Sequence, residues 1–249
     1  MTAFLSNPAP DAAACAVVEL RQYTLKPGRR DELVTLFDRE FIETQEAVGM
    51  KVLGQFRDLD APDRFVWLRG FAGMAARRAG LQAFYGGPVW AGHGPAANAT
   101  MLDSDDVLLL RPAWDGAAVR PRETRPDRLA AAPAAGFVDL TVFPLREPAS
   151  PELVALARER LAPCLAAGGA RQTAWYVTEP APNDFPRLPV REGEPVLVGL
   201  ALFDDEGEYT RFVRGGTWQC DAAPTLAPFL AGPPQALRLA PTARSAIRG

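Results

Sequence analysis

Three polar side chains alternate along one apolar segment near the start of the sequence. Glu19, Arg21 and Tyr23 lie two residues apart, and the apolar residues Val18 and Leu20 alternate with them. Successive side chains of a β-strand point to opposite faces, so the three polar groups are expected to share one face. A carboxylate, a guanidinium and a phenol on one face could bind an anion and transfer a proton. The pattern therefore predicts a polar site on this strand.

A second segment alternates in the same way. Trp67, Arg69 and Phe71 share a face opposite Val66 and Leu68. If the apolar faces of both strands meet the helices, the polar faces line the interior of the fold. Together they would form an aromatic cavity with two guanidinium groups, suited to an anionic or planar organic ligand.

The two arginines of this predicted cavity would repel each other. Burying Arg21 and Arg69 together costs several kcal/mol unless a carboxylate or a bound anion compensates, so we expect Glu19 or an anion within reach. The alternative is that Glu19 and Arg21 form ion pairs between strands at a rim and serve structure alone.

The sequence contains one histidine, His93, in the segment Trp90-Ala91-Gly92-His93-Gly94-Pro95, which we interpret as a flexible loop. Its near-neutral pKa suits a general base at the mouth of a cavity, with Tyr23 as the other candidate for proton transfer; the alternative is a solvated loop residue. The cysteines are isolated and the acidic clusters lack calcium-loop spacing. We therefore expect neither a metal nor a tightly bound cofactor.

The elements that would position these residues form two similar series. In the first half, strands are predicted at 16–25, 49–58, 64–71 and 107–110, and helices at 28–47 and 74–84. The second half repeats this order, with strands at 139–145, 172–177, 196–203 and 235–239. Each series reads β-α-β-β-α-β, which is the ferredoxin-like plan.

The chain is therefore expected to be α+β with two ferredoxin-like domains, at 16–112 and 136–241. The Pro-, Arg- and Ala-rich residues 113–135 are typical of a linker, and the proline-rich residues 179–194 of a surface loop. Packing the two sheets face to face gives an eight-stranded barrel with the helices outside. Closure within one chain is the simpler arrangement, and pairing between chains in a homo-oligomer is the alternative.

The first half resembles a known family. Residues 19–28, ELRQYTLKPG, are similar to the ELR-x-Y-x-L-K-P-G opening of NIPSNAP domains, and Gly54-Gln55-Phe56, residues 66–81 and Trp90 extend the likeness over residues 16–112. The resemblance implies a ferredoxin-like fold of the dimeric α+β barrel type. It implies neither a settled activity nor a signature catalytic set.

Two departures from the family pattern affect the site. Arg69 and Phe71 stand where the family usually has W-x-Y, which predicts a more cationic pocket. In the second half, Thr141 and Phe143 stand at the places of Arg21 and Tyr23. We therefore expect an asymmetric site, with the better-formed polar cavity in the first half.

Composition narrows the classes of function. The net charge is −3 and no basic block occurs, so we expect no nucleic-acid partner. No apolar run approaches the roughly 20 residues that span a bilayer, and residues 1–14 lack the pattern of a signal peptide, so we expect a cytoplasmic protein without a membrane partner. The leading hypothesis is a bacterial enzyme acting on a small molecule, of the cofactor-independent oxygenase or isomerase type. The alternative is a non-catalytic ligand-binding or protein-interaction module.

Overall fold

The computed structural model describes residues 15–249, so the expectation for residues 1–14 lies outside the described part. The first half contains β1 (Val17–Leu25), α1 (Arg30–Leu36), the π-helical η2 (Phe37–Phe41), α2 (Ile42–Glu46), β2 (Lys51–Asp58), β3 (Arg64–Phe71), α3 (Met74–Tyr85), α4 (Pro88–Thr100) and β4 (Met101–Pro112). The second half contains β5 (Phe137–Pro144), α5 (Pro151–Leu156), the π-helical η3 (Ala157–Leu161), α6 (Ala162–Ala167), β6 (Gln172–Thr178), β7 (Val196–Phe203), α7 (Glu206–Gly215), η4 (Trp218–Ala222), η5 (Ala223–Phe229) and β8 (Gln235–Pro241).

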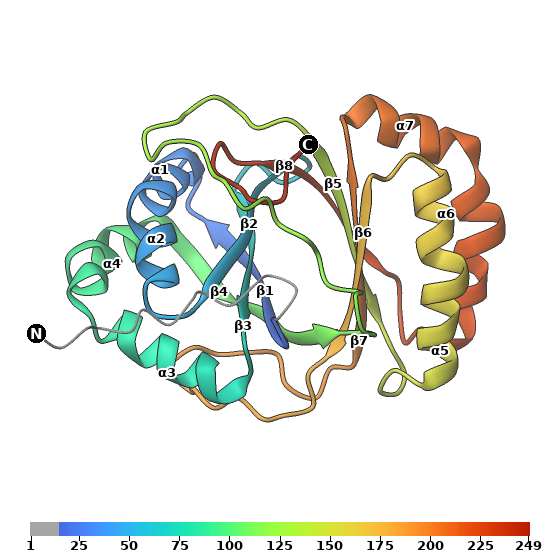
Figure 1. Ribbon diagram of the computed structural model, residues 1–249, viewed down its shortest axis with the longest axis horizontal. Coiled ribbons are helices and arrows are strands. Elements are labelled where there is room, and N and C mark those ends of the chain that lie inside the picture. The colour runs from blue at the N-terminus through green and yellow to red at the C-terminus, as the bar shows by residue number, and fades with distance from the viewer. Residues whose placement is uncertain (1–14) are drawn as a thin grey trace, which may run out of the picture.

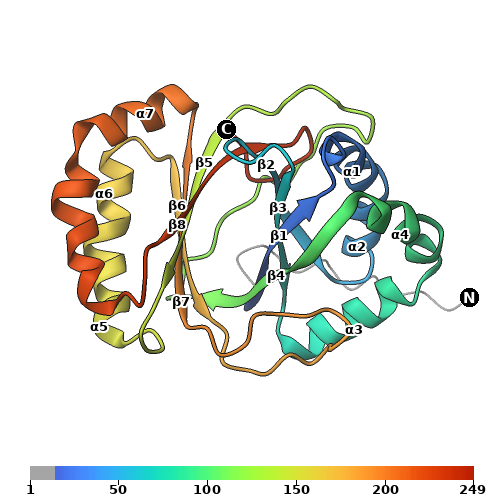
Figure 2. The same cartoon turned by 180° about the vertical axis from the view of Figure 1, so that it is seen from behind.

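The eight strands close into one barrel in the order β1-β3-β2-β8-β5-β7-β6-β4. Antiparallel pairing of β2 with β8 and of β4 with β6 joins the two halves. Helices α1 to α4 cover the outside of one half and α5 to α7 the outside of the other (Figures 1 and 2). The predicted α+β fold of two ferredoxin-like halves with helices outside is confirmed, and the barrel closes within one chain.

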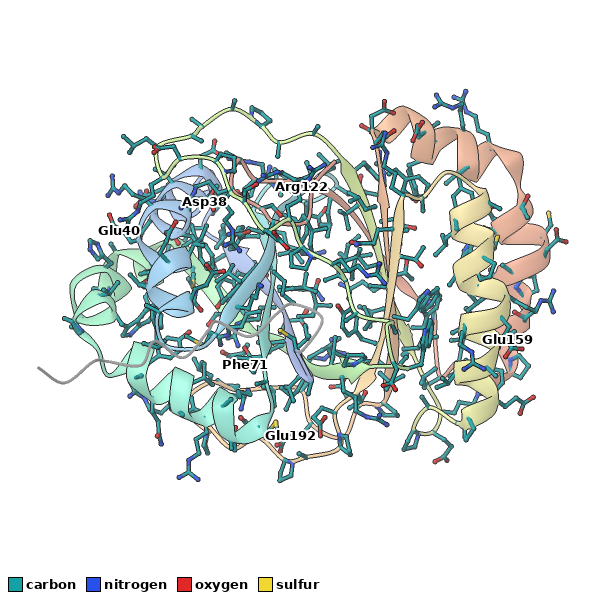
Figure 3. All side chains as sticks on the ribbon, viewed as in Figure 1. Asp38, Glu40, Phe71, Arg122, Glu159 and Glu192 are labelled. Atoms are coloured by element: carbon teal, nitrogen blue, oxygen red, sulfur yellow. The ribbon has the colours of Figure 1, made fainter. Side chains whose placement is uncertain are left out.

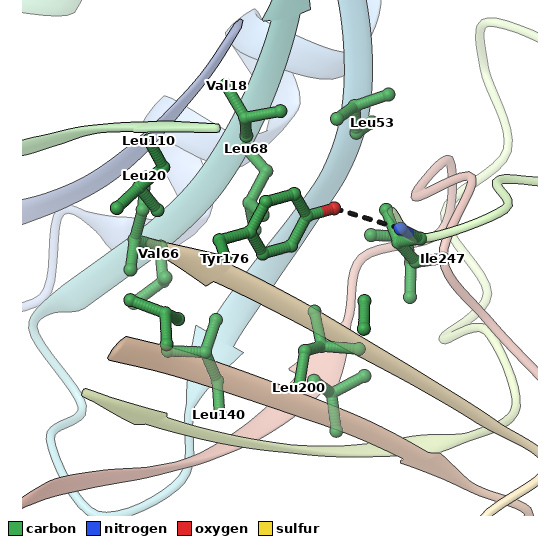
Figure 4. Packing of buried hydrophobic residues seen from close by; sticks show 14 of the residues in the cluster. Val18, Leu20, Leu53, Val66, Leu68, Leu110, Leu140, Tyr176, Leu200 and Ile247 are labelled. Atoms are coloured by element: carbon green, nitrogen blue, oxygen red, sulfur yellow. Dashed lines mark hydrogen bonds between the residues drawn. The ribbon is translucent and has the colours of Figure 1, made fainter. Parts of the chain in front are cut away.

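The barrel interior is a continuous apolar core. Side chains from both halves meet there, as Figure 4 shows for Leu20, Leu68, Leu140 and Leu200, each at most 1% exposed. An eight-stranded barrel is just wide enough for side chains to fill it. The interior therefore serves packing, and a ligand site must lie elsewhere.

Two segments differ from the sequence-based expectation. Residues 90–95, predicted as a loop, lie within helix α4. This helix has Pro88 in its first turn, a favourable position because backbone nitrogens there have no acceptor within the helix and the missing N–H of proline costs nothing. The connection from β4 to β5 has no helix or strand, as predicted, but it packs on both halves: the amide of Val119 donates to the hydroxyl of Tyr176 at 2.9 Å, and Arg125 pairs with Glu46.

The proline-rich loop at residues 179–194 crosses from the second half to the first. It is the orange segment that leaves β6 and runs toward α3 before returning to β7 (Figures 1 and 2). Its Phe185 is buried in the apolar cluster beneath the helices of the first half. Across the described residues, no helix is long and apolar enough to cross a membrane.

Candidate functional site

The side chains of β1 and β3 alternate between two faces as predicted, but the apolar face lines the barrel and the polar face meets the helices. The register places Glu19 beside Arg69 and Arg21 beside Trp67. Val18 belongs to the barrel core, whereas Trp67 belongs to the cluster under the helices. The prediction that the polar face lines the barrel is therefore wrong. Both faces of these strands are buried, and the charged side chains lie on the helix side, where they find polar partners.

Glu19 is the centre of a buried ion cluster. Its Oε2 accepts hydrogen bonds from Arg21 Nη1 at 2.8 Å and from Arg69 Nη2 at 2.6 Å. Its Oε1 accepts from Arg77 Nε, on α3, at 2.7 Å. All four residues are at most 1% exposed. The expectation that a carboxylate lies within reach of both predicted arginines is confirmed.

The cluster carries more positive than negative charge. Burial alone would raise the pKa of Glu19, but the charges of Arg69, Arg21 and Arg77 outweigh it and hold that pKa well below its usual range. Asp184, from the loop at 179–194, supplies a second carboxylate by pairing with Arg77. Three guanidinium groups therefore face two carboxylates, which leaves an environment that favours a further anion.

Tyr23 adds a phenol beside this charge. Its hydroxyl accepts a hydrogen bond from Arg21 Nε at 3.0 Å. Burial raises the pKa of Tyr23, and the charge of Arg21 opposes that rise only in part. The phenol is therefore neutral at physiological pH and keeps a proton that it can donate.

Aromatic rings hold the guanidinium groups in place. The guanidinium carbon of Arg69 lies 5.0 Å from the ring centroid of Trp67 and 5.5 Å from that of Phe71, labelled in Figure 3. The guanidinium carbon of Arg21 lies 5.5 Å from the ring of Tyr23. These distances are within the range of cation–π attraction. The rings thus stabilise cations that are removed from water.

A cavity of about 260 Å³ opens between the sheet and the helices of the first half. Its lining comes from β1, α3, α4, the start of β4 and the loop at 179–194, and consists of Arg21, Tyr23, Tyr85, Trp90, Asn98, Met101, Ser104, Phe185, Arg187 and Leu188. A void of about 20 Å³ adjoins it, bounded in part by Trp67. The cavity is thus an aromatic pocket with one deeply buried cation, Arg21.

Comparison with known proteins identifies this half. Residues 18–114 match the family model of NIPSNAP. The first half is a NIPSNAP domain. No curated protein sequence matches the chain.

Solved structures resemble the whole chain, beyond the NIPSNAP domain. A candidate monooxygenase from Lactobacillus acidophilus is 10% identical over 92% of this chain and 96% of its own, with a TM-score of 0.57. One from Fusobacterium nucleatum is 10% identical over 92% and 93%, with a TM-score of 0.59. An anthrone oxidase-like protein is 14% identical over 94% of both chains, with a TM-score of 0.53. At these identities the likeness concerns the fold alone.

The structure brings most of the predicted site residues together in the NIPSNAP domain. Of these, Arg21 and Tyr23 line the cavity, and Trp67 borders only the small void. The other three residues, Glu19, Arg69 and Phe71, are buried and do not line the cavity. Whether any of them binds a ligand stays a prediction.

His93 does not join the group. It lies on helix α4, its side chain is 40% exposed, and its Nε2 lies 3.8 Å from a carboxylate oxygen of Glu40. Figure 3 shows Glu40 at the outer edge of the helical layer, away from the sheet. The expected position at the cavity mouth is therefore wrong, because the segment is a helix whose outer face carries His93. Among residues 15–249, no three His, Cys, Asp or Glu side chains are grouped to hold a metal ion.

Sequence reasoning missed several residues of the cavity and its support. Arg77 stands in the segment that resembles the family, but a helical arginine gives no sign that it points inward. Tyr85 and Trp90 are aromatic residues at the ends of helices, where packing is the simpler interpretation. Phe185 and Arg187 come from the other half of the chain. The nearby prolines indicated a surface loop and gave no signal of a contact with the NIPSNAP domain.

A larger cavity, of about 580 Å³, is lined mainly by residues 146–148, 178–182 and 190–195. Its two arginines are already engaged. Arg191 pairs with Asp106 and Glu194, and the guanidinium of Arg146 donates to the carbonyl of Leu230 at 2.7 Å. We therefore place the site in the smaller cavity, where charge is left uncompensated.

The second half holds no comparable cavity at the corresponding place. Asp139, Thr141 and Trp175 border a void of only about 10 Å³, room for about one water molecule. Trp175 packs against Gly199, where a Cβ atom would lie 2.9 Å from the indole ring. By register, Gly199 stands at the place of Trp67 and Trp175 at the place of Gln55, so each half has one indole on this face of the sheet. The smaller void agrees with the expected asymmetry.

Proposed function

We propose that the NIPSNAP domain binds a small planar organic anion in the 260 Å³ cavity and converts it without a metal or tightly bound cofactor, as an oxygenase or isomerase. One observation carries the proposal. Arg21 reaches the cavity from a cluster with excess positive charge, and its guanidinium donates to the neutral phenol of Tyr23. Cations and donors that are fixed in a low-dielectric site stabilise developing negative charge.

This arrangement suits substrates with a weakly acidic C–H or O–H group. Positive charge beside the bound group lowers its pKa, so an enol or phenol is held as its anion. In an isomerase, the ligand would lose its proton to water, and Tyr23 would donate its hydroxyl proton to a different carbon and be reprotonated from solvent. In an oxygenase, the carbanion would give its electron pair to dioxygen, forming a C–O bond and a peroxide that takes up a proton. The description of structural neighbours as candidate monooxygenases and as anthrone oxidase-like supports the second reaction.

The first test measures ionisation of a bound probe. Naphthol, a planar two-ring phenol, should bind to the protein and ionise at a lower pH than in free solution, which its absorbance reports. Arg21→Gln should weaken binding about tenfold to a hundredfold, the range for a charged hydrogen-bond partner, and abolish the shift in ionisation. Arg78→Gln, an exposed arginine on α3, makes the same charge change and should have no effect. Equal effects of the two variants would place the ligand elsewhere.

A second candidate function is ligand binding without turnover. The observation that favours it is the lining of the cavity, where no residue is a carboxylate or an imidazole that could serve as a general base. Oxygen uptake and the recovered ligand distinguish the two. A ligand that binds at Arg21, is recovered unchanged and consumes no oxygen would support a binding module.

A further inference from the structure

The loop at 179–194 holds a defined turn over the cavity. Asn183 Nδ2 donates to the carbonyl of Leu188 at 2.9 Å, and its Oδ1 accepts from the amide of Phe185 at 3.1 Å. The ring of Phe185 stacks on Tyr85 of α3, with centroids 6.1 Å apart and planes at 29°. The turn is thus fixed internally and attached to the NIPSNAP domain.

A buried arginine ties the same turn to the ion cluster. Arg77 Nη1 donates to Asn183 Oδ1 at 3.1 Å and pairs with Asp184, while its Nε donates to Glu19. Arg77 itself is completely buried. These contacts fix the position of the turn, because the buried guanidinium of Arg77 cannot exchange its partners for water.

Arg187 projects from this turn to the outer end of the cavity. It is exposed, it lines the cavity together with Asn98 and Ser104, and no acidic side chain of residues 15–249 pairs with it. At the other end Arg21 is 1% exposed. The cavity therefore has a cation at each end and aromatic walls between them.

Resting on the proposed function, we propose that the ligand is a planar aromatic carboxylate whose second acidic group is a phenol or enol. Arg21 and Tyr23 hold the phenol or enol at the inner end, and Arg187 binds the carboxylate at the outer end. The second half thus supplies the residue that selects carboxylated ligands, although it has no comparable cavity at the corresponding place. A guanidinium matches the two oxygens of a carboxylate in geometry as well as in charge.

The test compares two probes on three proteins. Naphthol and a hydroxynaphthoate, with its hydroxyl and carboxylate at opposite ends of the rings, are titrated calorimetrically into wild type, Arg187→Gln and Arg214→Gln. Arg214 is an exposed arginine of α7 and provides a matched change of charge. Wild type should bind the hydroxynaphthoate more tightly, and Arg187→Gln should lower that affinity about tenfold, less at high salt. Its affinity for naphthol should stay unchanged.

Every other result contradicts either the inference about Arg187 or the proposed function itself. Equal losses for both probes in Arg187→Gln would show that the loop only shapes the pocket, and no loss for the hydroxynaphthoate would show that its carboxylate does not reach Arg187. Either result overturns the inference and leaves the anion site at Arg21 intact. Failure of wild type to bind naphthol would instead contradict the proposed function itself, and the inference with it.

Discussion

Asp139 occupies in the second half the place that Glu19 takes in the first, but it is not held in an ion cluster. Its neighbours across the sheet are Ala201 and Arg238, whereas Glu19 is paired with Arg69, and the guanidinium of Arg238 pairs instead with Asp60 and Glu206. One carboxylate oxygen of Asp139 is buried and lacks a hydrogen bond. Burial raises the pKa of this carboxyl to about 6, although a hydrogen bond from Thr141 lowers it in part. The same strand position thus carries a permanent anion in one half and a titrating acid in the other.

Asp139→Asn should change the dependence of stability on pH. Between about pH 4 and pH 6 the folded carboxyl keeps a proton that the unfolded one has lost, so wild type becomes less stable as pH rises, by up to roughly 3 kcal/mol. The variant lacks this loss and should be the more stable protein at neutral pH, with little difference at pH 4. Urea unfolding at both pH values checks this. An equal difference at both would exclude titration of Asp139 as the cause.

Helix α4 shapes the cavity through one glycine. A Cβ atom at Gly94 would lie 2.7 Å from the indole of Trp90, so Gly94→Ala must displace that ring from the cavity wall. We expect weaker naphthol binding, measured by calorimetry, with the fold retained. Gly92, in the same helix, has nothing within 4 Å. Gly92→Ala should leave binding unchanged and add about 0.5–1 kcal/mol of stability through its better helix propensity. Equal binding in both variants would show that Trp90 is not part of the binding wall.

At the scale of elements, sequence periodicity predicted which residues share a face of a strand, but not which face meets the helices. Alternation separated Val18 and Leu20 from Glu19 and Arg21 correctly, but period two does not say which face meets the helices when both are buried. The segment around His93 was predicted as a loop because it is rich in glycine and proline. It forms a helix because packing of Trp90 on Tyr85, with ring centroids 4.6 Å apart, overrides weak local propensity.

At the scale of the molecule, the two halves share one core and should unfold together. Leu200, in β7 of the second half, is completely buried in the barrel core that also contains Val18 and Leu68 of the first. Leu200→Ala should cost about 2–5 kcal/mol, the usual range for a cavity of this size, in a single transition seen by both tryptophan fluorescence and circular dichroism. Leu59→Ala, at a position 43% exposed, is the matched control and should have little effect. Separate transitions for the two halves would contradict a shared core.

The difference in volume between the cavities of the two halves has a consequence for how such a barrel can vary. In a barrel built from two identical chains, one substitution appears at two places, so a side chain that filled one cavity would fill both. Here the strands of both halves belong to one polypeptide. One half can therefore give up its pocket to solid packing while the other keeps an open one. Because the chain is continuous, the second half, whose corresponding cavity is filled, still contributes Phe185 and Arg187 to the cavity of the first.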